Sequence, residues 1–378
     1  MGDRIAQALV AALVLVGVVA PIAVAAPIDS DRCGAQPAVV VPNVRRAQAR
    51  FDWNDDAIET TVRFKSRTCA ELNGTLYAPD VLSKKPMPGV VVLPPSGGVA
   101  DESQVAYIAR TLASNGYLAI TADPQGIGDS GLLSNPACGT EPGFSNPSPC
   151  PGVPFQTMDN WMELARSTLD FFLSPANPYR SHLDAGAIGA VGHSLGARAS
   201  SYLQDPRFDG AGSVRIHAVV GLDNISSNYY GDSSAGGGNS AANDAVVGQP
   251  LPGDAPIAIS VPGLGLASDG TNADPDFKKF AFARWRDAGV PSGMLVFKGV
   301  VHDDFSQAAA SDEAMLHRFA YYTLAWFDRW LRNDKTATDR LLSRNVIGTD
   351  ATTLLSDTQH SAWYLPGAMQ CDDWRTGC

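Results

Sequence analysis

The sequence predicts an α/β fold, with a mostly parallel central sheet and helices on both faces. Short apolar runs alternate along the chain with longer stretches whose apolar residues recur at helical spacing. Gly89–Leu93 (GVVVL) is a continuous apolar run, which is typical of a parallel strand buried on both faces. Strands that alternate with helices are expected to pair in parallel and to be covered by helices on either side.

The expected elements follow one another from residue 60 to residue 332. The expected strands are Thr60–Phe64, Gly74–Ala78, Gly89–Leu93, Tyr117–Ala122, Ala187–Gly192, His217–Leu222, Ile257–Val261 and Met294–Phe297. The expected helices are Glu102–Ser114, Phe155–Leu173, Ala197–Leu203, Phe277–Asp287 and Glu313–Arg332. The last helix carries an aromatic stripe that we expect to pack in the core: Phe319, Tyr322, Trp326, Phe327 and Trp330.

Three polar, glycine- and proline-rich segments interrupt this alternation, at Gly131–Pro154, Asn224–Pro256 and Leu264–Pro275. Each follows the carboxyl end of an expected strand, which is the edge where open α/β sheets bind ligands. The chain has neither an internal repeat nor a clear linker. We therefore expect residues 26–378 to form a single catalytic domain with long loops at 131–154 and 224–256.

Composition narrows the class of protein. The 378 residues are 45% hydrophobic, which is enough for a large core and excludes global disorder. The formal net charge of −11 argues against a nucleic-acid partner, because a phosphate backbone requires a basic surface.

The first 25 residues have the pattern of a secretory signal peptide. Asp3 and Arg4 precede an apolar run that ends in Ala23-Val24-Ala25-Ala26-Pro27, with small residues at the cleavage site. The alternative is an uncleaved membrane anchor, because the run is almost long enough to span a bilayer. Cleavage predicts a secreted protein without a stable membrane span.

Six cysteines remain after the expected cleavage, and an even number in an exported chain indicates disulfides. The simplest connectivity joins sequence neighbours: Cys33 to Cys69, Cys138 to Cys150 and Cys371 to Cys378. The alternative is that some of these cysteines are free thiols.

The most informative motif is Gly192-His193-Ser194-Leu195-Gly196, which lies between an apolar strand and an expected helix. In Gly-x-Ser-x-Gly, the serine sits on a sharp strand-to-helix turn that exposes its hydroxyl above the sheet. We expect Ser194 to be a nucleophile. The alternative is a serine in an ordinary turn.

A serine nucleophile needs a base, and the base needs an orienting acid. His302 is the expected base because it follows the last expected strand and a glycine. Asp269, beyond the strand Ile257–Val261, fits the chain order Ser…Asp…His and is the first candidate for the acid. Asp223, directly after His217–Leu222, is the alternative acid.

The oxyanion hole requires two backbone N–H donors. Leu195, directly after the nucleophile, should supply one donor. The second should come from the loop after Leu93, where Pro94 and Pro95 have no N–H, so Ser96 or Gly97 is expected.

With these motifs, the chain resembles the α/β-hydrolase fold family over roughly residues 60 to 335. The segment Asp123-Pro124-Gln125-Gly126-Ile127-Gly128-Asp129-Ser130 is similar to that family's loop after its fourth strand. The opening segment, Leu72–Pro79, is similar to the dienelactone-hydrolase-like branch and to secreted bacterial esterases, lipases and polyesterases. Dienelactone hydrolases proper use a cysteine where this chain has Ser194, and cutinase-like enzymes lack its length and long loops.

We expect no cofactor and no metal. Gly126–Gly131 matches Gly-x-Gly-x-x-Gly, but no helix is expected to open there, as a dinucleotide site requires. The segment Asn272–Asp276 has alternating oxygen ligands and lacks the glycine and distal glutamate of a calcium loop.

The expected function is that of a secreted serine esterase or lipase acting on small-molecule or lipid-like esters through an acyl-enzyme. A serine peptidase or acyltransferase with the same triad is the alternative enzyme, and a non-catalytic hydrolase-like binding module is the alternative of another class. The sequence does not fix the oligomeric state.

Overall fold

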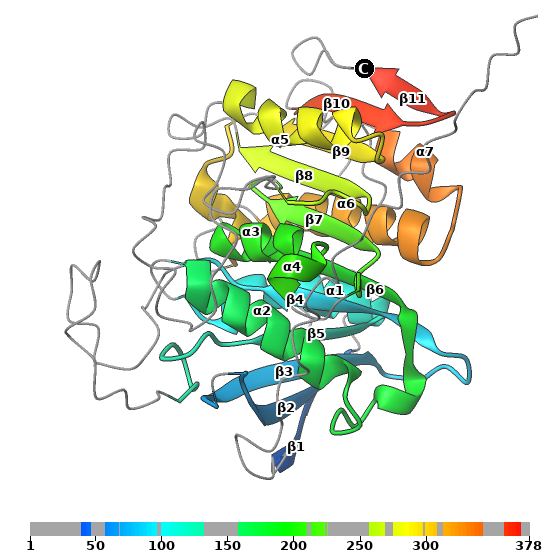
Figure 1. Ribbon diagram of the computed structural model, residues 1–378. Helices are drawn as coiled ribbons and strands as arrows, with labels where there is room; N and C mark the ends of the chain where they lie inside the picture. The colour runs from blue at the N-terminus through cyan, green and yellow to red at the C-terminus, as the bar shows by residue number, and fades with distance from the viewer. Residues whose placement is uncertain are drawn as a thin grey trace, which may run out of the picture.

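The computed structural model describes residues 39–46, 57–67, 69–96, 100–131, 158–209, 213–223, 225, 257–268, 275–297, 299–307, 313–342 and 359–371. Their strands form one sheet in the order β1-β2-β3-β5-β4-β6-β7-β8-β9-β10-β11 (Figure 1). The strands are β1 (Val39–Arg46), β2 (Ala57–Lys65), β3 (Glu71–Pro79), β4 (Met87–Leu93), β5 (Leu118–Ala122), β6 (Leu183–His193), β7 (Ala218–Leu222), β8 (Gly263–Ser268), β9 (Ser292–Phe297), β10 (Gln359–Leu365) and β11 (Met369–Cys371).

The sheet is mixed. Parallel pairing joins the central strands β5, β4, β6, β7, β8 and β9. On one side, β3, β2 and β1 pair antiparallel, and on the other side β10 and β11 do so. The expected parallel sheet therefore corresponds to the centre of a wider, mixed sheet.

Helices cover both faces of this sheet, as predicted. The helices α1 (Ala106–Ser114) and α6 (Glu313–Leu331) pack on one face, and α2 (Met158–Leu173), α3 (Leu195–Tyr202) and α5 (Pro275–Asp287) pack on the other. Residues of β4 alternate between the two layers: Val90 and Val92 belong to one buried cluster, and Val91 and Leu93 to the other. Two short helices, α4 (Pro206–Asp209) and α7 (Ala337–Leu342), complete the described set.

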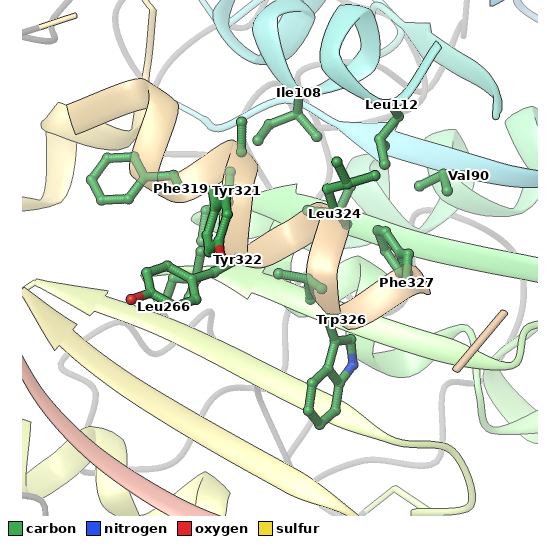
Figure 2. Packing of buried hydrophobic residues seen from close by; sticks show 14 of the residues in the cluster. Val90, Ile108, Leu112, Leu266, Phe319, Tyr321, Tyr322, Leu324, Trp326 and Phe327 are labelled. Atoms are coloured by element: carbon green, nitrogen blue, oxygen red, sulfur yellow. The ribbon is translucent and has the colours of Figure 1, made fainter. Parts of the chain in front are cut away.

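The aromatic stripe of α6 packs in the core, as the sequence predicts. Figure 2 shows Phe319, Tyr322, Trp326 and Phe327 on this helix, and they belong to the same buried cluster as Val90 of β4. All four aromatic residues are fully buried, and Trp330 packs against the same cluster. The stripe anchors α6 beneath the central strands.

One predicted strand is wrong. Residues Ile257–Val261 form no strand, and β8 begins at Gly263 instead. Side chains rather than a neighbouring strand bind this backbone: Gln204 Oε1 accepts from the N–H groups of Ser260 and Val261, at 2.8 and 3.2 Å. The run is apolar because Ile257 and Val261 are buried against the helical layer, a role that hydrophobicity alone does not distinguish from a strand. The expected loop Leu264–Pro275 is therefore also wrong over its first residues, which lie in β8.

The remaining predicted elements lie within a few residues of the observed ones, and β1, β10 and β11 were not predicted. Residues 1–25, most of the expected loops at 131–154 and 224–256, and the segment Asn272–Asp274 lie outside the described residues. Cys69 and Cys371 are the two described cysteines, and neither is a free thiol. The other four lie outside the described residues, so the expected pairings remain predictions.

Candidate active site

Ser194 lies on the sharp turn between β6 and α3. Its backbone is in a strained conformation, with φ at 56° and ψ at −118°. Its N–H donates to Leu222 O, at the end of the neighbouring strand β7, over 3.3 Å. The side chain is partly exposed. The turn thus holds the hydroxyl at the carboxyl edge of the parallel strands, as the motif predicts.

The glycines on either side of Ser194 make this turn sterically feasible. A Cβ on Gly192 would lie 2.4 Å from the backbone of Gly196. A Cβ on Gly196 would lie 2.4 Å from Leu93 O and 2.5 Å from Pro94 O. The loop after β4 therefore packs directly against the turn that carries Ser194.

His302 opens a short 3₁₀ turn, η6 (His302–Phe305), after β9. Ser194 Oγ donates to His302 Nε2 over 3.0 Å. On the other side of the ring, His302 Nδ1 donates to the carboxylate of Asp223. Hydroxyl, imidazole and carboxylate thus form one continuous hydrogen-bonded chain.

Asp223 lies in the position expected first of Asp269, because its carboxylate accepts from His302 Nδ1. It directly follows β7, with φ at 62°, and its side chain is only 4% exposed. Its Oδ1 accepts from the N–H and the hydroxyl of Ser268, at 2.9 and 2.7 Å, which leaves Oδ2 for His302. Asp269 lies outside the described residues. The hydrogen bond from His302 Nδ1 to its carboxylate favours Asp223, the alternative acid, for this role.

The expected oxyanion donors are described in part. Leu195 is the first residue of α3, so its N–H has no acceptor within the helix. Ser96 is partly buried in the loop after β4, and Gly97 lies outside the described residues. Trp161 Nε1 of α2 donates to Pro94 O over 2.6 Å and anchors this loop beside the nucleophile turn.

Contacts that were not predicted from the sequence hold the turn that carries His302. Asp304 Oδ2 accepts from the N–H of Val301 over 2.8 Å, and Tyr107 Oη donates to Phe305 O over 3.1 Å. The ring of Phe305 stacks on Phe319 of α6, with centroids 4.2 Å apart. Asp304 and Phe305, shortly after His302, were the only local sign of these contacts. The partner of Asp304 is nearby in sequence, whereas Tyr107, which binds Phe305, is distant.

The glycine-rich segment after β5 folds around Asp123. This buried carboxylate accepts from the N–H groups of Glu102 and Asp129, at 2.9 and 3.0 Å. A Cβ on Gly128 would lie 2.3 Å from Asp123 Oδ2. The backbone of this Gly-x-Gly-x-x-Gly segment is therefore turned toward an internal carboxylate, and no helix follows it up to residue 131.

A second carboxyl lies beside Asp123. Glu102 Oε1 accepts from Thr75 Oγ1 over 2.7 Å, and Thr121 Oγ1 also donates to this carboxyl. Burial, followed by the nearby charge of Asp123, raises the pKa of Glu102 to about 8. Burial also raises the pKa of Asp123.

Within the described residues, no group of three or more histidine, cysteine or acidic side chains could hold a metal ion. Nor does that part of the chain contain a helix long and apolar enough to cross a membrane. No protein-family model matches the chain, and a search of curated proteins finds no match. The function proposed below therefore rests on the sequence and on the geometry of the site.

Proposed function

We propose that this protein is a secreted serine hydrolase of the α/β-hydrolase fold that cleaves carboxylic esters through an acyl-enzyme. The observation that most directly supports this proposal is the hydrogen-bonded chain from Ser194 through His302 to Asp223, with the serine on a strained strand-to-helix turn. Strain of this kind persists at functional sites because the surrounding structure enforces it.

In the first half of the reaction, His302 Nε2 takes the proton of Ser194 Oγ while that oxygen attacks the ester carbonyl carbon. The negative carbonyl oxygen of the tetrahedral intermediate receives hydrogen bonds from Leu195 N–H and from the Ser96–Gly97 segment. The Asp223 carboxylate stabilises the imidazolium that forms and fixes the tautomer that leaves Nε2 free to accept.

The first half ends when the carbon–oxygen bond to the alcohol breaks, His302 gives its proton to the leaving alcohol, and the acyl group remains on Ser194. Water then loses a proton to His302 Nε2 and attacks the acyl carbon. Ser194 recovers its proton when the carboxylic acid leaves. One ester and one water thus give one acid and one alcohol.

The topology supports assignment to the α/β-hydrolase fold. The three catalytic side chains follow β6, β7 and β9, so all lie at the carboxyl edge of the central parallel strands. Their order along the chain is Ser, Asp, His, as in that fold. Secretion is supported by the amino-terminal sequence pattern and by described cysteines that are not free thiols.

The test uses the mature protein with p-nitrophenyl esters from acetate to palmitate and with a serine-directed fluorophosphonate. We expect ester turnover and labelling of Ser194, both abolished in Ser194→Ala. Ser213→Ala, a serine exposed before β7, is the matched control and should retain both. Labelling without turnover of any ester would favour a peptidase or acyltransferase. Absence of both would contradict catalysis and favour a binding module.

A further inference from the structure

His193 is a buried side chain that the proposed reaction does not use. It is the last residue of β6, directly before Ser194, and is 1% exposed. Burial of an imidazole is costly unless its polar atoms are hydrogen-bonded. Its contacts therefore indicate what the side chain does beside the nucleophile.

Those contacts go to the turn that carries the general base. His193 Nδ1 and Ser306 Oγ share a hydrogen bond of 3.0 Å, and Ser306 is itself only 7% exposed. The ring of His193 also lies against His302, with centroids 4.8 Å apart and planes inclined by 44°. A third ring, Phe305, lies 5.8 Å away.

We propose that His193 is a positioning residue for His302, and this inference rests on the proposed function. Because Ser194 is its immediate neighbour, the bond to Ser306 ties the turn of the base to the strand that ends at the nucleophile. The ring of His193 also supports one side of a base whose own side chain is 41% exposed. The two contacts together fix the 3.0 Å approach of His302 to Ser194.

Apart from the bond of the base to the nucleophile itself, the hydrogen bond of Asp304 and the ring stacking of Phe305 lead elsewhere. Asp304 bonds within the turn, to Val301, and Phe305 packs against α6. Those contacts shape the turn and hold it to the helical layer, whereas His193 joins it to the strand of the nucleophile. Because misplacement of a reacting group by about 1 Å can reduce the rate roughly 10²-fold, loss of this link should lower kcat.

The test separates the hydrogen bond from the ring. His193→Phe keeps a ring and loses the bond, Ser306→Ala removes the same bond from the turn, and His193→Asn keeps a polar atom near the position of Nδ1. We expect His193→Phe and Ser306→Ala each to lower kcat for p-nitrophenyl butyrate about tenfold or more, with little change in KM. The double variant should lose little more than either single variant, and His193→Asn should recover part of kcat.

A background without the base distinguishes positioning from a general structural effect. In His302→Ala, the residual rate should not fall further when His193→Phe is added. His217→Phe is the matched control, because His217 lies before β7 and accepts the N–H of Ile188 at the opposite end of the strands. If His193→Phe does not fold, Ser306→Ala carries the same comparison.

Three results would overturn this inference. One is unchanged kcat in the Ser306→Ala variant and in a folded His193→Phe variant, and another is an equal loss with and without His302. A third is a loss confined to KM. Each overturns positioning alone if the fluorophosphonate still labels Ser194. Failure of the wild-type protein to react with the fluorophosphonate would overturn the proposed function as well.

Discussion

At the scale of single residues, the acid of the proposed triad shows how tertiary contacts decide a role. An aspartate directly follows each of two neighbouring strands: Asp223 follows β7, and Asp269 follows β8. The last residue of β8, Ser268, donates twice to Asp223 and turns its other oxygen toward His302. Asp223 is thus oriented by its neighbours in the way that a triad acid requires.

We predict that Asp223→Asn lowers kcat for p-nitrophenyl esters by roughly 10³–10⁴-fold. The amide N–H₂ would favour the tautomer of His302 with its proton on Nε2, which cannot accept the proton of Ser194. Asp303→Asn is the control, because Asp303 lies beside His302 with an exposed side chain. A full loss in Asp269→Asn, with activity kept in Asp223→Asn, would return the role to Asp269.

The nucleophile, the base and two candidate acids could be proposed from local patterns, whereas the positioning contacts and the choice between the acids could not. Ser194 lies in a five-residue motif, and His302 follows an apolar strand and a glycine. The choice of acid depends on which of two strand ends faces the imidazole, and the partner of His193 lies 113 residues away. Such choices are made by packing between segments that are distant in sequence.

At the scale of elements, hydrophobic periodicity predicted the central α/β alternation because each buried strand is apolar on both faces. It misplaced β8, since Ile257–Val261 is as apolar as a strand, whereas β8 itself, Gly263–Ser268, is rich in small residues. A Cβ on Gly263 would lie 2.5 Å from Trp285 Nε1. The small residues of β8 let α5 approach the sheet closely. Hydrophobicity scales score small residues low, so a strand built from them is difficult to predict.

The turn between β6 and α3 gives the prediction that belongs to this scale. Gly196→Ala should lower kcat at least 10²-fold, because its Cβ would push the loop after β4, and the oxyanion donor on it, away from Ser194. The overlap is with backbone oxygens, so we also expect a loss of about 1–3 kcal/mol in the free energy of unfolding.

Steady-state kinetics and urea unfolding would measure both effects of Gly196→Ala. Gly186→Ala, in β6, is the control, because its Cβ would approach only the side chain of Asp184, at 3.3 Å. Wild-type kcat in Gly196→Ala would mean that the loop after β4 does not contribute to the oxyanion site.

At the scale of the whole molecule, one edge of the sheet collects both the groups of the proposed triad and an acidic pair, of which Asp123 is buried and Glu102 is partly buried. Loops after β4 and β5 place Glu102 and Asp123 beside each other, and the hydroxyls of Thr75 and Thr121 donate to Glu102. Asp101 adds a further negative charge nearby. In a chain with a net charge of −11, such a site makes the folded state less stable as pH rises from about 4.5 to about 8.

The sign of this sensitivity follows from proton binding. The pKa of Glu102 is raised from 4.5 to about 8 in the folded state, so the folded chain holds a proton that the unfolded chain has already lost. The resulting stabilisation is fully present below about pH 4.5 and is lost as pH rises toward about 8. Above that value, both states are ionised at this residue and its contribution no longer changes.

Glu102→Gln, which mimics the protonated carboxyl, should remove this dependence. One pKa unit equals about 1.4 kcal/mol. Residue 102 is partly exposed to screening solvent. We therefore expect the free energy of unfolding of the variant, relative to that of the wild type, to rise by roughly 2–4 kcal/mol between pH 5 and pH 9. Urea unfolding at steps of one pH unit would measure this gain, and Glu71→Gln, at an exposed ion pair with Arg63, is the control. If the free energy of unfolding changes with pH in the same way for wild type and Glu102→Gln, Glu102 is already ionised at pH 5. The loops after β4 and β5 would then hold two negative charges side by side.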